Sequence, residues 1–546
     1  MNCAPSPRSS LYANSPLLFL GGFLVIAAVY LFFLEPWGHD TWFHLQRLAD
    51  IDQQLEWGHL RAHFAENAAQ GKGLPVWIYY SQWVYWPALL AVALGAGPLV
   101  ALKLVYCASL LVCTAGCYRL LRLHADAGAA SFGTLLFMTS NYVVGEVFQR
   151  SAYAEFMSVS LLPFVLAALN CAIRRRNLAS KAQAALFAAI MILCHPLSFM
   201  NSGVLLLAYA AFVALDAKLP PRRILGAAWP LVLALALTAF YWLPAVIETR
   251  FVMAGKGART PLEDTFLSLG SYLNFSGITN LGFVLSLLAA VVALYFVRSV
   301  FLPSARRARA CWPLVVAVLA YFLLTLRISE PLYDHVSLLA ANLWVWRVLF
   351  QMTLLVVIVV VVNLGTLAES LKGDGTRAAL AAIAVLQAVA LVVWNTNSEL
   401  STRRLSREEI ATQVAIESQR VGDFGIDEYL PNPNQVPRPP ETCREILTVP
   451  RGGRYEMSVI VAAGDADSCI HIPRFWNTRY EARFDGKKLP VYADSNGEIL
   501  IAPRGGAGRI DVRFGRPAYV TAASLVSLIA LGLLVAMFAV ARRRPA

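Results

Sequence analysis

Long apolar segments recur along almost the whole chain of 546 residues, and they restrict it to one broad class of fold. Hydrophobic residues make up 58% of the sequence and charged residues 15%, with a mean hydropathy of +0.57. This is too apolar for a soluble globular protein. A bilayer-crossing helix needs about 20 apolar residues, so we expect about twelve transmembrane helices. The candidate spans are 16–34, 98–119, 127–146, 156–173, 181–194, 197–215, 225–246, 279–298, 311–326, 348–366, 377–395 and 518–541.

Lysine and arginine gather on alternate connections between these segments, which predicts the orientation of the chain. Such residues favour the cytoplasmic side of a membrane, so both termini are expected in the cytoplasm. This places 35–80, 247–278, 327–347 and 396–517 outside. No cleavage site follows the first span, so we expect a retained cytoplasmic tail at 1–15. The basic loops account for much of the net charge of +12, and no nucleic-acid motif accompanies it. We therefore expect no nucleic-acid partner.

One apolar stretch, 77–95, does not fit this alternation. A full span here would move Arg119 and Arg122 to the external side. Its density of Trp and Tyr is typical of the membrane interface. We interpret it as a juxtamembrane or re-entrant helix, and a thirteenth span is the alternative.

The segment 396–517 has the composition of a soluble domain between spans, and 518–541 and the basic tail 542–546 follow it. A Pro-rich linker ends near residue 440. After about 450, short alternating segments separated by Asp485-Gly486, Asn496-Gly497 and Gly505-Gly506 predict a small antiparallel β-sandwich. Cys443 and Cys469 are the two cysteines of this domain, and we expect a disulfide between them if the compartment is oxidising.

The most informative polar cluster directly follows the first span. His39, Asp40, His44 and Arg47 lie within about two helical turns of one another. Asp40 is a candidate base for an acceptor hydroxyl. The two histidines and Arg47 are candidates for phosphate binding, and Asp40 with His44 for holding a divalent cation. The alternative is structural, with Asp40 as the N-cap of an amphipathic helix over 42–55.

Three further polar groups are expected on the external face. Arg150, Tyr153 and Glu155 provide a cation, a hydroxyl and a second carboxylate, although arginine and tyrosine also serve as interfacial anchors. His195 occupies a tight turn between two spans, where a structural role is the alternative. Trp344 and Arg347 precede another span. Snorkelling explains such an arginine, but Arg347 facing the membrane domain is also a candidate for binding a lipid-linked phosphate.

These motifs resemble the GT-C superfamily of membrane glycosyltransferases, specifically bacterial YfhO-like proteins and membrane proteins related to 6-pyruvoyl-tetrahydropterin synthase (PTPS-related). The resemblance covers nearly the whole chain, 16–395 forming the GT-C-like domain. The segments that carry it are Gly38 to Arg47, Gly58-His59-Leu60, Gly71 to Tyr80, Arg150 to Glu155 with Leu162-Pro163, Cys194-His195-Pro196, Trp344 to Arg347 and Arg479 to Gly486.

The resemblance implies sugar transfer from a polyprenyl-phosphate donor to a polysaccharide, lipid or protein acceptor outside the membrane. It places the acidic residue of the family's first loop, a base or metal ligand, at Asp40. Glu155 is a candidate second catalytic carboxylate because it starts a span and needs a partner there. The family's frequent paired acidic motif is absent, because His39 and Thr41 flank Asp40. Whether Mg²⁺ or Mn²⁺ takes part, and whether transfer inverts or retains configuration, stays open. A lipid-glycan transporter or flippase and an envelope scaffold are the alternative functions.

Overall fold

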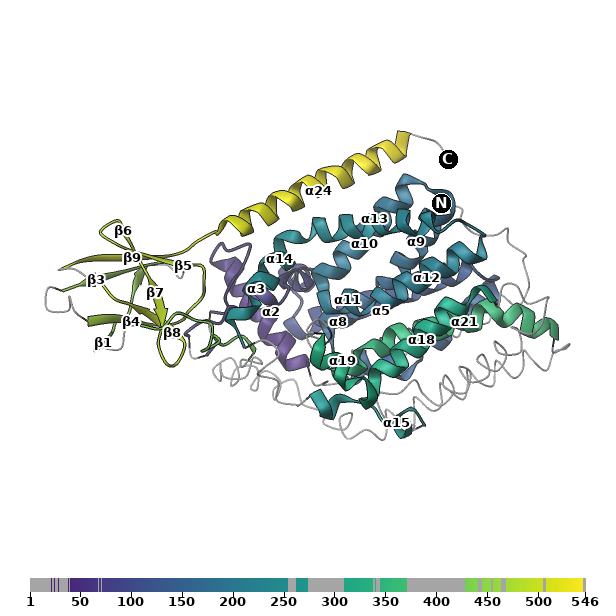
Figure 1. Cartoon of the computed structure of the whole chain (residues 1–546), viewed down its shortest axis with the longest axis horizontal. Helices are drawn as coiled ribbons and strands as arrows, with labels where there is room; N and C mark the ends of the chain where they lie inside the picture. Colours follow the sequence, from purple (N-terminus) through teal and green to yellow (C-terminus); the bar gives the residue numbers. More distant parts are fainter. Residues whose placement is uncertain are drawn as a thin grey trace.

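The computed structural model divides the chain into a helical bundle and a β domain that projects from one end of it (Figure 1). It describes residues 40–253, 262–273, 309–336, 344–370, 428–439 and 444–543, with short gaps at 67, 70, 453–454, 463–467 and 504–506. Gly21, Leu24, Ala28, Gly38 and Leu339 are also described.

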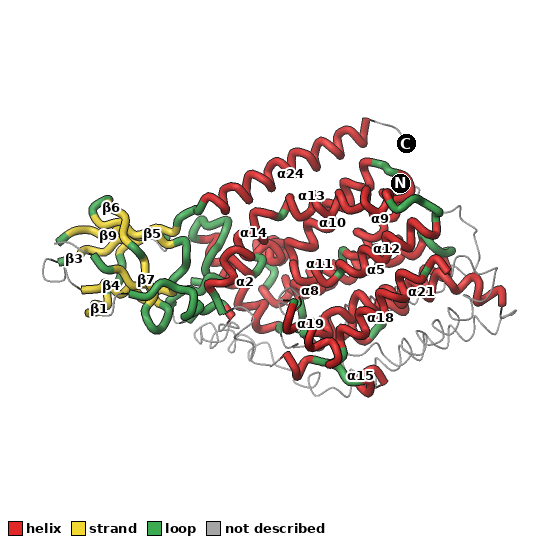
Figure 2. Tube along the Cα trace, in the orientation of Figure 1, coloured by secondary structure: helices red, strands yellow, loops and turns green. Residues whose placement is uncertain are grey.

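Helices make up most of the described residues up to residue 370, and one more follows the β domain (Figure 2). The first group is α2 (Thr41–Glu56), α3 (Val76–Tyr79), η2 (Gln82–Tyr85), α4 (Trp86–Ala93), α5 (Pro98–Arg122), α6 (Ala127–Met138), α7 (Asn141–Gly145), η3 (Glu146–Arg150), α8 (Tyr153–Val159), α9 (Leu162–Arg175), α10 (Leu178–Cys194) and α11 (Pro196–Asn201). The second is α12 (Gly203–Asp216), α13 (Arg222–Leu237), α14 (Ala239–Glu248), η4 (Thr249–Phe251), η5 (Leu262–Thr265), α15 (Leu269–Leu273), α18 (Trp312–Thr325), η6 (Arg327–Ser329), α19 (Glu330–His335), η7 (Val345–Val348), α21 (Leu349–Ser370) and α24 (Ala518–Arg543).

Within the described residues, four helical segments are long and apolar enough to cross a membrane. They are Pro98–Arg122, Tyr153–Arg175, Val345–Asn363 and Ala518–Arg543, and a fifth span is present if the bent pair α13 and α14 counts as one. Four shorter apolar helices, α6, α10, α12 and α18, lie among them. Of the twelve expected spans, 279–298 and 377–395 lie outside the described residues, as does nearly all of 16–34.

The stretch 77–95 is broken into α3, η2 and α4. The longest of these, α4, has eight residues. A helix of that length rises about 12 Å, well short of the roughly 30 Å of a hydrocarbon core. The expected span 127–146 is likewise interrupted, because α6 ends at Met138 and η3 is a π-helical turn.

The β domain consists of two sheets that share one core. One sheet has the order β1 (Arg444–Leu447), β4 (Ser468–Phe475), β8 (Glu498–Ile501), β7 (Val491–Ala493). The other has the order β2 (Arg451–Gly452), β3 (Glu456–Val461), β9 (Gly508–Phe514), β5 (Tyr480–Phe484), β6 (Lys487–Leu489). Inward side chains of both sheets, including Val459, Ile472, Ile499 and Val512, meet in this core. The predicted helical membrane fold with a small sheet domain before the last helix is confirmed.

Two details of that domain differ from the prediction. β1 pairs with β4 in parallel, so the sandwich is not wholly antiparallel. The strands β1 and β2 were not predicted, because their short segments lack a run of alternating apolar residues. Cys469 is disulfide-bonded. Its expected partner Cys443 lies outside the described residues, so this pairing stays a prediction, although the next residue, Arg444, is in register with Ser468.

Buried ion pairs attach the β domain to the helical bundle. Arg474 Nη2 lies 2.7 Å from Glu66 Oε2 in the first external loop, and Arg479 Nη2 lies 2.6 Å from Glu248 Oε1 at the end of α14. The hydroxyl of Tyr519, at the start of α24, donates to the same Glu248 oxygen at 2.9 Å. Three segments expected on the external face are therefore packed together.

Candidate active site

The candidate site lies where several helix ends meet, and a backbone reversal between η3 and α8 creates it. The π-helical turn η3 ends at Ser151, which has a left-handed backbone with φ 53°. Such turns are frequent at functional sites. The reversal lets α8 begin at Tyr153, and Arg150 at the end of η3 and Glu155 in the first turn of α8 then lie close together.

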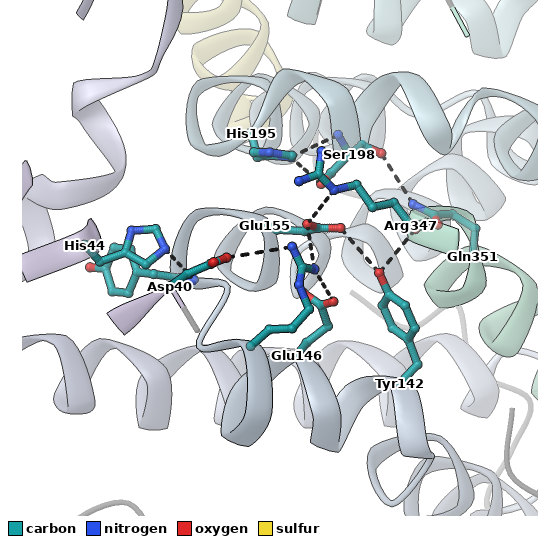
Figure 3. Close-up of polar contacts among 11 residues, drawn as sticks. Asp40, His44, Tyr142, Glu146, Glu155, His195, Ser198, Arg347 and Gln351 are labelled. Atoms are coloured by element: carbon teal, nitrogen blue, oxygen red, sulfur yellow. Dashed lines mark hydrogen bonds and ion pairs between the residues drawn. The ribbon is translucent and has the colours of Figure 1, made fainter. Parts of the chain in front are cut away.

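Arg150 connects three carboxylates. Its Nη1 donates to Glu146, four residues earlier, and lies 3.1 Å from Glu155 Oε2. Its Nη2 lies 3.8 Å from Asp40 Oδ2 (Figure 3). The Glu146 and Glu155 side chains are buried, whereas that of Asp40 is 40% exposed. One edge of the guanidinium is thus held inside the protein, and the other faces the accessible carboxylate.

Arg347 approaches the same group from η7. Its Nε lies 3.4 Å from Glu155 Oε2, the oxygen that Arg150 also contacts. Tyr142 of α7 donates to Glu155 Oε1 at 3.4 Å. Glu155, which we predicted as a second catalytic carboxylate, is therefore enclosed by two cations and a hydroxyl. This geometry favours a role in positioning the arginines over proton transfer.

Asp40 occupies the N-cap position of α2, as the structural alternative expects, but its side chain makes no capping hydrogen bond. The Asp40 N–H donates to the Arg150 carbonyl at 2.8 Å. The Gly38 N–H donates to Thr41 Oγ1 at 3.1 Å. The main chain thus fixes the start of α2 against the end of η3 and leaves the Asp40 carboxylate on the arginine side. The neighbouring His39 lies outside the described residues.

Both ring nitrogens of His44 have hydrogen-bond partners within the protein. The Tyr153 N–H donates to His44 Nε2 at 3.2 Å, so the ring proton is on Nδ1, which lies 2.8 Å from the Tyr85 hydroxyl. Burial lowers the pKa of His44 well below its usual value, and the nearby Arg47 and Arg150 lower it further. Because both nitrogens are engaged, the expected roles in phosphate or metal binding are not supported.

Three other predicted binding residues pack against aromatic rings. Arg47 is fully buried between the rings of Phe43 and Tyr80, 3.4 and 3.6 Å from their centroids. Tyr153 is 1% exposed and stacks on Tyr85. Trp344 contacts Trp346, and it is the Trp346 ring that lies under Arg150, 4.6 Å from its guanidinium carbon.

His195 caps a helix. Its Nδ1 accepts from the Ser198 N–H at 3.3 Å, at the start of α11, and lies 2.7 Å from the Ser198 hydroxyl. Burial lowers the pKa of His195 to about 4, against the opposing influence of Glu155. The structural alternative explains these contacts. The turn nevertheless lies beside Arg347, as Figure 3 shows.

A divalent cation at this site does not fit the residues present. One oxygen each of Glu146 and Glu155 is paired with an arginine, and both His44 nitrogens are hydrogen-bonded. A carboxylate that already faces an arginine attracts a divalent cation less strongly. We derive no step through a metal here.

Glu146 is the main residue that sequence reasoning missed. It is fully buried, and its Oε2 has no hydrogen-bond partner in the part of the chain that the structure describes. The spacing of Glu146 and Arg150, four residues apart, was the available signal. The sequence hides this signal because Glu146 is the last residue of the apolar segment 127–146.

Comparison with known proteins assigns the family of this chain. A family model described as "Family of unknown function (DUF6541)" matches residues 3–421, more than three quarters of the sequence. The chain belongs to this family. No curated protein matches it.

Three of the solved structures to which this chain is similar are the following. The apo oligosaccharyltransferase of Archaeoglobus fulgidus is 12% identical, with a TM-score of 0.44, and the match covers 80% of this chain and 62% of that one. The mycobacterial arabinofuranosyltransferase AftD is 13% identical, with a TM-score of 0.44, and the match covers 76% of this chain and 29% of that one. ArnT from Cupriavidus metallidurans bound to undecaprenyl phosphate is 11% identical, with a TM-score of 0.40, and the match covers 90% of this chain and 98% of that one. The chain thus spans about three fifths of the oligosaccharyltransferase.

Proposed function

We propose that this protein is a GT-C membrane glycosyltransferase of the YfhO-like and PTPS-related kind. It transfers a sugar from a polyprenyl-phosphate donor to a polysaccharide, lipid or protein acceptor on the external face of the bacterial inner membrane. The observation that carries this proposal is the accessible Asp40 carboxylate beside Arg150, whose other edge Glu146 and Glu155 hold in the interior. Sugar transfer from a phosphate needs both a base and a fixed cation.

In the proposed reaction Asp40 accepts the proton of the acceptor hydroxyl. The acceptor oxygen forms a bond to the anomeric carbon of the sugar, and the bond from that carbon to the donor phosphate oxygen breaks. Polyprenyl phosphate leaves with the bonding electron pair. The Nη2 edge of Arg150, which faces Asp40, is placed to stabilise the negative charge that develops on this phosphate.

The remaining residues of the network fix this arrangement. Glu155 binds Arg150 and Arg347, so the two guanidiniums keep a constant separation. Glu146 binds the same Arg150 nitrogen, Nη1, that Glu155 contacts. Groups that are already oriented before substrate arrives lower the reorganisation needed during reaction. Arg347, whose side chain is 14% exposed, is the second candidate for the donor phosphate.

The test compares cells that lack the protein with cells supplied with wild type or Asp40→Asn. Mass spectrometry of lipid-linked intermediates and envelope glycans is the readout. We expect loss of one sugar from a glycan and accumulation of its polyprenyl-phosphate donor, restored by wild type only. A flippase or a scaffold does not need the Asp40 proton acceptor, so full restoration by Asp40→Asn would contradict the proposal.

A further inference from the structure

A second group of ionisable side chains lies in the β domain, within the sheet that contains β1, β4 and β8. His471 Nε2 on β4 lies 3.0 Å from Glu498 Oε2 and 3.5 Å from Asp494 Oδ2. Glu445 on β1 approaches His471 at its other nitrogen, at 3.9 Å. Donor atoms of Glu445, His471 and Asp494 all lie within 4.8 Å of one another. Among the described residues this is the one such grouping of three metal-binding side chains.

The two buried carboxylates are oriented by contacts on their far sides. Asp494 Oδ1 accepts from the main-chain N–H groups of Asn496 and Glu498, at 2.9 and 2.7 Å. Glu498 Oε1 is bound by Lys72 Nζ at 2.6 Å. Each carboxylate therefore has one oxygen occupied and presents the other to His471. Outer contacts that orient ligands in this way are a regular feature of metal sites.

The distances and the charges also fit a metal ion. A tetrahedral ion with ligands at about 2.0–2.1 Å places neighbouring ligand atoms about 3.3 Å apart, close to the 3.0 and 3.5 Å seen at His471 Nε2. In the described part of the chain, Lys72 is the only lysine or arginine ion-paired with these carboxylates. Arg438 binds the Asp494 main-chain carbonyl instead. With a neutral His471, three carboxylates against one lysine leave two negative charges, which a divalent cation balances.

We propose that His471 Nε2, Asp494 and Glu498 bind a structural zinc ion, and that Glu445 on β1 orients the His471 ring from the side of its other nitrogen, Nδ1. An imidazole with carboxylates suits zinc, and imidazole disfavours magnesium and calcium. The ion would join β4 and β8 directly, and β1 through Glu445. Through Lys72, it would also stabilise the contact between this sheet and the first external loop. The site is separate from the Asp40 chemistry, and its existence does not depend on the proposed glycosyl transfer.

The experiment uses the full-length protein in detergent, purified with a tag that contains no histidine and stripped with chelator. Zinc chloride is titrated by calorimetry, and zinc retained after dialysis is measured by mass spectrometry. We expect one zinc per chain, a higher melting temperature with zinc, and no response to magnesium at the same concentration. His471→Gln and Asp494→Asn should each weaken zinc binding at least a hundredfold.

Glu445→Gln keeps the test decisive if those buried variants fail to fold. Glu445 is 46% exposed, and its ion pair among the described residues is with His471, so its replacement should preserve the zinc-free melting temperature and weaken zinc binding about tenfold. Glu456→Gln, an exposed change on β3 in the other sheet, is the matched control and should bind zinc normally. If the protein binds no zinc, the cluster is an ion pair of a protonated His471 with its carboxylates. If zinc binding is unchanged in all three site variants, the bound ion is adventitious. Either result would overturn the proposal.

Discussion

Arg150 is the residue on which the candidate site depends most, because among the described residues it is the one that contacts both the buried and the accessible carboxylates. Removing one partner of a buried ion pair leaves an uncompensated charge and is strongly destabilising. Substitutions of Arg150 or Glu155 would therefore mix effects on folding with effects on chemistry. Asp40, whose side chain is 40% exposed, is the better residue for isolating chemistry.

His44 predicts a pH dependence of stability. Its pKa is lowered in the folded state, so below about pH 6.5 the unfolded chain binds a proton that the folded chain resists. Stability should fall as the pH drops from 6.5, by up to about 1.4 kcal/mol per pH unit for this group. In His44→Gln this slope should be smaller, as measured by thermal unfolding between pH 7 and pH 5. The exposed His335→Gln is the control, and equal slopes in wild type and His44→Gln would contradict the account.

Sequence reasoning identified several site residues but assigned roles less well. The sequence could single out Asp40, Arg150, Glu155 and Arg347 because charged residues next to spans are rare and conspicuous. In the structure these four side chains form one network. The enclosure of Arg47 and the pairing of His44 with Tyr85 depend on side chains distant in the sequence. No local pattern encodes such contacts.

Among elements, the contact between the start of α2 and the end of η3 determines where Asp40 lies. A methyl group on Gly38 would overlap the side chain of Ser151. We expect Gly38→Ala to displace Asp40 from Arg150 and lower transfer at least tenfold, since small misplacements of catalytic groups are costly. Melting temperature should change little. The matched change is Gly58→Ala, where a methyl group meets no atom within 4 Å, although its φ of +81° adds local strain. Normal transfer by Gly38→Ala would contradict the role of this contact.

The elements themselves were predictable where their periodicity is strong. The strands β5 and β9 coincide with alternating apolar segments beside the predicted turn dipeptides Asp485-Gly486 and Gly505-Gly506. The break of 127–146 at Thr139 and Ser140 was not predictable. Their side chains bond the carbonyls of Leu135 and Phe137 and so compete with the continuing helix.

At the scale of the whole molecule, buried ion pairs join the β domain to the bundle. Glu248→Ala leaves Arg479 buried without its anion and should destabilise the protein by about 3–5 kcal/mol. The double variant Glu248→Leu with Arg479→Met should lose less than either single charge removal. The exposed pair Glu456 and Arg513 is the control, with an expected effect of about 0–1 kcal/mol. Thermal unfolding measures the stability of the single, double and control variants. Losses of stability at Glu248 and Arg479 that simply add in the double variant would contradict the coupling.

Topology is a second prediction at this scale. The ion pair between Arg174 and Asp216, at 2.5 Å, gathers two predicted cytoplasmic connections at one place. A cysteine placed at Asn496 should react with an impermeant maleimide in intact spheroplasts, whereas one placed at Arg175 should react only after lysis. Labelling in the opposite order would overturn the orientation.

The measurement that tests the central claim most directly is transfer by purified protein, reconstituted with a polyprenyl-phosphate sugar donor and its acceptor. Asp40→Asn keeps the size of the side chain but cannot accept a proton. We predict that its turnover falls by about a hundredfold or more while donor binding stays near that of wild type. Arg347→Ala should have the reverse effect, with donor binding weakened before turnover is affected. Near-normal transfer by Asp40→Asn would contradict the assignment of Asp40 as the base.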